Sequence, residues 1–165
     1  MFVGLIADTH DRLPYIKRAV DRLNEEDVEA VLHAGDYIAP FVVKYFKPLK
    51  ARMIGVFGNN DSMKRTLTET FSELGFSVNS YFRSLELDGR RFALTHGDEE
   101  ELLRSLIDSG YYDVVVYGHT HKMETYMRSE TLVVNPGEVC GYLTNKSTIA
   151  ILNTETLEVR TVLLK

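Results

Sequence analysis

Short apolar runs alternate with amphipathic stretches through the first two-thirds of the chain. Residues 2–7, 30–34 and 53–57 are apolar runs of strand length. Four apolar residues recur at helical spacing after the first run, namely Leu13, Ile16, Val20 and Leu23. Residues 41–46 predict a short helix, and the apolar positions between 67 and 74 predict another. This order is typical of strands that alternate with helices.

From residue 81 onward, strand-like runs follow one another more closely. Residues 81–87 and 91–95 flank Asp88-Gly89, a dipeptide that favours a two-residue hairpin. A helix is expected around Leu102–Ile107, because its apolar residues share one face. Further strands are expected at residues 113–117, 123–127, 131–134, 148–152 and 158–164. We therefore predict an α/β protein with two packed sheets and helices outside, mixed-parallel in its early strands and antiparallel in its late ones.

Five apolar strands each run into a cluster of Gly, Asp, Asn or His at the carboxyl end. The clusters are Asp8-Thr9-His10, Gly35-Asp36, Gly58-Asn59-Asn60-Asp61, His96-Gly97-Asp98 and Gly118-His119-Thr120-His121. In open α/β sheets the ligand crevice lies beyond those strand ends. We therefore expect the five clusters to meet at one edge of the molecule.

The residue types in these clusters indicate a metal site. Asp8 and His10 are two residues apart, as are His119 and His121, so an extended backbone would point each pair to one side. Carboxylate, imidazole and amide ligands suit hard to borderline divalent ions such as Mn, Fe, Co, Ni or Zn. One cysteine is too few for a cysteine-rich structural zinc site.

Composition narrows the class of protein further. The chain has 165 residues, 44% of them hydrophobic and 26% charged, which predicts one domain over residues 1–165. The net charge of -5 weighs against nucleic acid as a partner. A single cysteine and an amino terminus without a charged leader favour the cytoplasm. No apolar stretch approaches the roughly 20 residues that a membrane span needs.

The blocks D-T-H, G-D, G-N-N-D, H-G and G-H-T-H, in this order, resemble those of the calcineurin-like metallophosphoesterase superfamily. The short chain and its Asn135-Pro136-Gly137 loop resemble the small, single-domain prokaryotic phosphodiesterase branch, the YfcE-like group. The resemblance implies a four-layer αββα sandwich with two mixed sheets, the metallophosphoesterase fold. It also implies a hydrolase that cleaves small phosphodiesters with a hydroxide shared by two divalent ions. Mn or Ni fits best, and Fe, Co or Zn is compatible.

The metal roles of the family carry over onto seven residues of this chain. Asp8, His10 and His121 would hold the first ion. Asn59, His96 and His119 would hold the second ion, and Asp36 would bridge the two. The resemblance also implies a homo-oligomer, either a dimer or a tetramer.

Two positions depart from the pattern of many family members, which carry His at both. Asn60 follows the third-block Asn, and its amide can donate to a phosphate oxygen but cannot act as a general acid. Asp98 follows the fourth-block Gly and, as a substrate contact, would repel a dianion. We therefore expect a preference for aryl esters, and for diesters over monoesters. Arg12 is a further candidate for phosphate contact, with a solvated turn position as the alternative.

Other polar residues have structural interpretations. His33 lies inside a predicted strand, so we interpret it as a core residue or as a residue that supports the ligands from behind. We interpret Asp61 as the cap of the helix that follows it. Cys140 is interpreted as a small residue near the Asn-Pro-Gly loop. Two alternative functions stay open on the same fold. One is a protein-interaction scaffold, as in the retromer subunit, although such scaffolds tend to lose ligands. The other is a nuclease, which the acidic balance disfavours.

Overall fold

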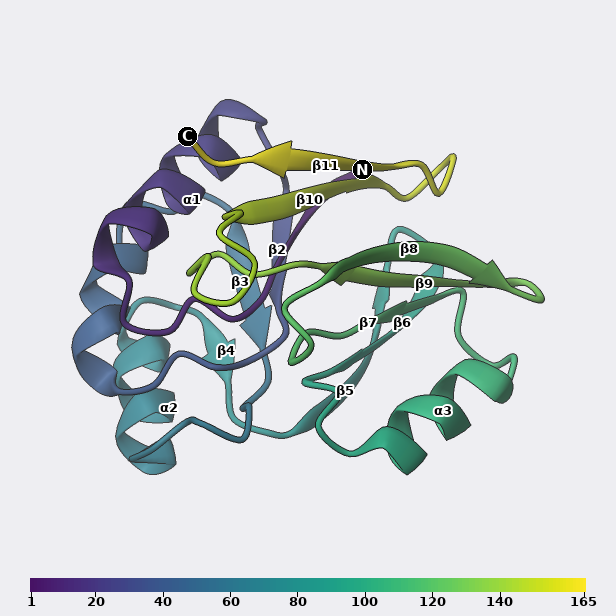
Figure 1. The fold of residues 1–165 in the computed structure, drawn as a ribbon, viewed down its shortest axis with the longest axis horizontal. Coiled ribbons are helices and arrows are strands. Elements are labelled where there is room, and N and C mark those ends of the chain that lie inside the picture. Colours follow the sequence, from purple (N-terminus) through teal and green to yellow (C-terminus); the bar gives the residue numbers. More distant parts are fainter.

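The computed structural model describes residues 1–165, and its strands form two sheets (Figure 1). The strands are β1 Phe2–Ile6, β2 Ala30–His33, β3 Arg52–Gly55, β4 Ser77–Val78, β5 Phe82–Leu87, β6 Arg90–Thr95, β7 Val114–Val116, β8 Met123–Arg128, β9 Thr131–Pro136, β10 Thr148–Asn153 and β11 Val159–Leu163. The helices are α1 Leu13–Glu25, the 3-10 helix η1 Pro40–Phe46, α2 Lys64–Glu73 and α3 Glu100–Asp108. None of these helices is both long enough and apolar enough to cross a lipid bilayer.

The sheets pack face to face with helices on both outer faces (Figure 1). The first sheet has the order β11-β10-β1-β2-β3-β4 and lies under α1, η1 and α2, whereas the second has the order β5-β6-β7-β9-β8 and lies under α3. Apolar side chains of both sheets, such as Leu5, Leu32, Leu94 and Val116, fill the space between them. The predicted αββα sandwich with two mixed sheets is therefore confirmed.

Strand pairing in the second sheet departs from the expectation of late antiparallel strands. The β5–β6 and β8–β9 pairs are antiparallel, but β6, β7 and β9 run parallel to one another. The reason is that α3 provides a helical crossover from β6 to β7, which parallel neighbours require. Strands β10 and β11 are antiparallel as expected, but they return to the first sheet.

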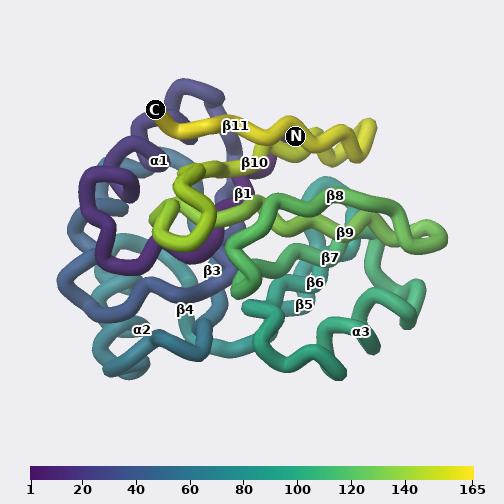
Figure 2. The backbone as a smooth tube through the Cα atoms, in the orientation of Figure 1, coloured from purple at the N-terminus to yellow at the C-terminus, as the bar shows by residue number.

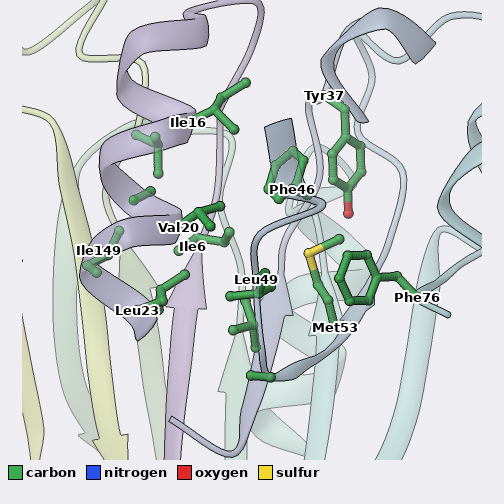
Figure 3. Packing of buried hydrophobic residues seen from close by; sticks show 14 of the residues in the cluster. Ile6, Ile16, Val20, Leu23, Tyr37, Phe46, Leu49, Met53, Phe76 and Ile149 are labelled. Carbon is green, nitrogen blue, oxygen red and sulfur yellow. The ribbon is translucent and has the colours of Figure 1, made fainter. Parts of the chain in front are cut away.

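A core of apolar and aromatic side chains fixes the helices on the first sheet (Figure 3). Ile16 and Val20 of α1 pack there, on the face that the helical spacing of the sequence predicts. Tyr37, Phe46 and Phe71 are fully buried, and the ring of Phe71 lies 5.0 Å from that of Tyr37 and 5.6 Å from that of Phe46, centroid to centroid. Because Tyr37 directly follows Asp36, this cluster anchors the loop after β2.

Removal of the Phe71 ring should destabilise the protein without touching the strand-end clusters. We expect Phe71→Ala to lower the free energy of unfolding by about 3–5 kcal/mol, because it leaves a cavity among fully buried rings. The matched control is Phe41→Ala in η1, where half of the side chain is exposed, and its cost should stay below about 1 kcal/mol. Urea denaturation of both variants measures the difference. Equal losses would contradict this account of the core.

Candidate metal centre

The seven predicted ligand residues lie together at the edge where β1, β2, β3, β6 and β7 end. Asp36 occupies the middle of the group and is almost fully buried. Its Oδ2 atom lies 3.5 Å from Nε2 of His10 on one side and 3.5 Å from Nε2 of His96 on the other. The side chains therefore form two sets that share one carboxylate.

The first set contains Asp8, His10 and His121. Nε2 of His121 lies 3.4 Å from Oδ1 of Asp8, and the rings of His10 and His121 are 5.4 Å apart, centroid to centroid. Oδ1 of Asp8 and Nε2 of His10 are buried atoms without a hydrogen-bond partner. Because buried polar atoms are nearly always paired, these two atoms indicate a site for a ligand.

The second set contains Asn59, His96 and His119. Oδ1 of Asn59 lies 3.0 Å from Nε2 of His96 and 3.1 Å from Nδ1 of His119. The two imidazole rings are 5.1 Å apart, centroid to centroid. An amide oxygen and two ring nitrogens thus meet beside Oδ2 of Asp36.

The backbone at most of these residues is left-handed, which corrects one step of the sequence argument. Asp8 and His10 have φ values of 50° and 44°, and His119 and His121 have 65° and 62°, so the i, i+2 pairs do not share a side through an extended strand. Asp36 is also left-handed, with φ of 62°. Such conformations cost on the order of 1 kcal/mol or more for non-glycine residues and concentrate at functional sites. Tight turns, rather than strand pleating, bring the ligand atoms together.

Glycines beside the ligands allow this close approach. A Cβ atom on Gly35, whose φ is 98°, would lie 2.7 Å from the Gly58 nitrogen and 2.9 Å from Nδ1 of His96. A Cβ atom on Gly118 would lie 2.8 Å from Oδ2 of Asp8. The loops after β2 and β7 therefore reach the centre only because these positions lack a side chain.

Hydrogen bonds on the outer nitrogens orient two of the histidines. Nδ1 of His96 lies 2.7 Å from the carbonyl oxygen of Ala34, which can only accept, so this nitrogen carries the proton. Nδ1 of His121 lies 2.6 Å from a carboxylate oxygen of Glu138, so it donates as well. In the neutral rings, the Nε2 lone pairs then face the centre, as metal ligation requires.

The donor set fits two divalent metal ions. Each half offers oxygen and imidazole nitrogen atoms, and Asp36 faces both halves. The unpaired atoms of Asp8 and His10 are the atoms that a cation would satisfy. Asp8, His10 and Asp36 also form a group whose ligand atoms all lie within 4.8 Å of one another.

Burial shifts the proton equilibria of several groups in the centre. Burial, and after it the charge of Asp36, raises the pKa of Asp8 well above its usual range. Burial also lowers the pKa of His10 and of His119, which favours the neutral, ligating form of both rings. A cation placed among these groups would favour the ionised form of Asp8.

Asp61 acts differently from the helix cap predicted for it. Helix α2 begins after Met63 and has no side-chain cap. The carboxylate of Asp61 instead accepts backbone N–H groups of Asp36 (3.1 Å), Tyr37 (2.5 Å), Ile38 (2.8 Å) and Gly58 (2.7 Å). Asp61 therefore ties the loops after β2 and β3 together and holds Asp36 and Asn59 in place.

His33 supports the centre from behind, as the sequence favoured. It is fully buried, and its Nδ1 accepts the N–H of Gly35 at 3.1 Å, so its Nε2 carries the proton. Nε2 lies 3.1 Å from Oγ1 of Thr9, and that hydroxyl donates to the carbonyl oxygen of Asp36 at 3.3 Å. These hydrogen bonds connect β2 with the loop after β1, through Thr9, and with the loop after β2, through Gly35 and Asp36.

The remaining candidates lie around the rim. Nδ2 of Asn60 donates to Oδ2 of Asp36 at 2.8 Å, and its backbone N–H donates to Oδ1 at 3.0 Å. The guanidinium of Arg12 bonds the carbonyl oxygen of Cys140 and lies 4.2 Å from the Tyr15 ring centroid, so it is committed to the protein rather than freely solvated. Asp98 is exposed after β6 and makes no hydrogen bond with the other candidates.

Glu138 is the functional candidate that the sequence analysis missed. It follows the Asn-Pro-Gly loop and is fully buried against His121, with Cys140 donating to it at 3.0 Å. Burial alone would raise the pKa of Glu138, but hydrogen bonds from His121, Cys140 and Thr144 outweigh burial and lower the pKa to about 2. A lone acid in a loop gives no periodic or motif signal, so only the three-dimensional contacts identify it.

Comparison with known proteins finds relatives along the whole chain. A family model described as the calcineurin-like phosphoesterase superfamily domain matches residues 1–157. The chain is 43% identical to phosphodiesterase MJ0936 of Methanocaldococcus jannaschii over the full length of both chains. It is 27% identical to phosphodiesterase YfcE of Escherichia coli K12 over 81% of this chain and 76% of that protein.

Solved structures give the same picture of the fold. A structure described as that of a novel archaeal phosphodiesterase superposes with a TM-score of 0.96 at 43% identity, covering 99% of this chain and 100% of the other. A structure of wild-type Vps29 from Entamoeba histolytica superposes with a TM-score of 0.70 at 21% identity, covering 100% of both chains. This second likeness concerns the fold alone.

The charge of Asp8 should destabilise the metal-free protein at neutral pH. Because folding raises its pKa, the unfolded chain releases this proton at lower pH than the folded chain, so stability is lost as pH rises above the ordinary value of 3.8. Asp8→Asn removes this penalty. We expect it to raise the melting temperature of metal-free protein at pH 8 by about 2–4 °C, and by less at pH 5.

The control for Asp8→Asn is Asp98→Asn, which neutralises an exposed carboxylate and should leave the melting temperature within about 1 °C. Calorimetry in the presence of a chelator at both pH values measures the effect. A lower melting temperature for Asp8→Asn at pH 8 would show that the Asp8 charge is compensated within the protein.

Proposed function

The chain belongs to the calcineurin-like phosphoesterase superfamily, and from this premise we propose that it is a metal-dependent phosphodiesterase of small phosphodiesters. The observation that carries the proposal is the pair of ligand sets that share Asp36. The relatives named phosphodiesterase support the type of reaction, because one of them matches over the full chain at 43% identity.

In this proposal, Asp8, His10 and His121 hold one divalent ion and Asn59, His96 and His119 hold the other. Asp36 serves both. The mixture of oxygen and nitrogen donors is compatible with Mn, Fe, Co, Ni or Zn, and the resemblance to the family favours Mn or Ni. When bound, such ions supply a nucleophilic oxygen at neutral pH and electrostatic stabilisation of the phosphate oxygens.

The residues of the chain fix the geometry of the reaction. Asp36 receives two hydrogen bonds from Asn60, so its carboxylate is held in one orientation between the two ligand sets. The side-chain amide of Asn60 has a second N–H, which is free to donate to a phosphoryl oxygen. Asn60 thus both positions Asp36 and contacts the substrate.

The rim has no evident acid to protonate the leaving oxygen. The Asn60 amide cannot donate a proton, and the ligand histidines use their inner nitrogens for metal. Asp98 is an exposed acidic residue at the rim and disfavours a dianionic monoester. The guanidinium of Arg12 is bound to the carbonyl oxygen of Cys140 and lies over the Tyr15 ring, so these contacts compete with direct binding of a phosphate.

The enzyme is favoured over a scaffold of the same fold, because all seven ligand residues are present and converge. A nuclease is disfavoured by the net charge of -5. A cytoplasmic location and a dimer or tetramer remain predictions.

Replacement of Asp36 should remove both metal binding and turnover. We expect Asp36→Ala to reduce phosphodiester hydrolysis to background and to weaken metal binding by at least about 10–100-fold, since even the loss of a ligand's supporting partner has that effect. Metal analysis, circular dichroism and turnover are measured together. Asp21→Ala, on the exposed face of α1, is the control and should match the wild type. Near-normal turnover in Asp36→Ala would rule out the proposed centre.

The absence of a proton donor should make turnover sensitive to the leaving group. A phenolate leaves without much protonation, whereas an alkoxide needs it, so wild-type rates on a phosphodiester series should fall steeply as leaving-group pKa rises. Asn60→His introduces a donor and should flatten this dependence. Asn60→Gln is the control and should keep the steep slope. A flat wild-type dependence would show that another residue donates the proton.

A further inference from the structure

Glu138 lies in the segment between β9 and β10 and is surrounded by hydrogen-bond donors. Its side chain has no exposed surface. Oε2 accepts from Nδ1 of His121 at 2.6 Å, Sγ of Cys140 at 3.0 Å and the N–H of Tyr142 at 2.8 Å. Oε1 accepts from the N–H of Thr144 at 2.6 Å and from its hydroxyl at 2.7 Å. Oε2 therefore contacts a candidate metal ligand, and both oxygens hold the loop.

The same segment packs against the loop that follows β1 (Figure 2). The N–H groups of Val139 and Cys140 donate to the carbonyl oxygens of Ala7 and Asp8, each at 3.0 Å. The hydroxyl of Tyr142 donates to Asp11 at 2.8 Å. Segment 138–144 therefore forms one wall of the first ligand set.

We propose that Glu138 is a positioning residue, which fixes the proton of His121 on Nδ1 and couples the geometry of this ligand to the fold of segment 138–144. The proposal rests on the proposed function, because it takes His121 as a metal ligand. A carboxylate on Nδ1 leaves the lone pair on Nε2, which lies 3.4 Å from Oδ1 of Asp8 and faces the first ligand set.

Only a carboxylate meets the hydrogen-bonding needs of this site. All the neighbours of Glu138 donate, and both of its oxygens accept from more than one of them. A glutamine would have to place its NH₂ group against one set of donors. If that group faced His121, Nδ1 would have to accept and the proton would move to Nε2. If it faced Thr144, the loop would lose its anchor.

The first test is zinc affinity, measured by competition with a chromogenic chelator. We expect Glu138→Gln to weaken the tighter zinc site by about 10–100-fold, the usual effect of losing such a partner. The control Thr144→Val removes the hydroxyl contacts with Oε1 and with the backbone of Lys146, but it leaves the contact between Glu138 and His121 in place. Its zinc affinity should stay within about twofold of the wild type. An unchanged affinity in Glu138→Gln would overturn the proposal.

A double-mutant cycle separates action through His121 from a loss of loop structure. In a His121→Ala background, Glu138→Gln should change zinc affinity by no more than about twofold, because its target is gone. An equal loss in both backgrounds would show that Glu138 acts through the loop or its charge, and would overturn the proposal.

The second test is the nuclear magnetic resonance spectrum of zinc-loaded protein with ¹⁵N-labelled histidine. In the wild type, His121 should show a proton on Nδ1 that exchanges slowly with solvent, and Glu138→Gln should lose this slow exchange. A wild-type His121 without a proton on Nδ1 overturns the proposal even where Glu138→Gln does not fold. A wild type that binds no zinc and none of the other divalent ions overturns the proposed function itself, a result distinct from normal binding in Glu138→Gln.

Discussion

The burial of carboxylates at one edge of the sandwich is the constraint on which the centre depends. Asp8, Asp36, Asp61 and Glu138 are all nearly or fully buried there, and a buried charge must be compensated. Asp61 and Glu138 are each surrounded by several donors, and Asp36 accepts from Asn60. Asp8 receives only a backbone N–H on one oxygen, and its other oxygen has no partner. The charge that the protein leaves uncompensated therefore lies where a cation is expected.

The fold tolerates this concentration of buried charge because its carboxylates have two different roles. The carboxylates of Asp61 and Glu138 each accept several hydrogen bonds within the protein and hold the loops after β2, β3 and β9. Asp8 and Asp36 then face the interior of the centre from well-defined backbone positions. The aromatic core around Tyr37 also anchors the loop after β2. These contacts support the left-handed conformations of the ligand residues.

The sequence was sufficient for the layers, for most strands and for the convergence of the five clusters, because these follow from periodicity and from the order of strand ends. It was insufficient where an outcome depends on the loop path. The pairs Asp8/His10 and His119/His121 meet through left-handed turns, which residue spacing cannot distinguish from an extended strand. Asp61 lies where a helix cap is common, yet most of its partners lie in the loop after β2. Glu138 has contacts only after the chain has folded, and the parallel β6-β7-β9 arrangement follows from the path of α3.

Because one fold can serve an enzyme or a scaffold, the choice between the two must rest on the centre and not on the sandwich. A scaffold needs neither an uncompensated buried carboxylate nor left-handed histidines. Both features lower stability, and mutation would readily remove them from a chain that gained nothing from them. This chain keeps the unpaired oxygen of Asp8, the left-handed His10, His119 and His121, and a buried carboxylate directed at His121. The cost is concentrated where the ligand atoms meet, which is the pattern expected of a site maintained for metal chemistry.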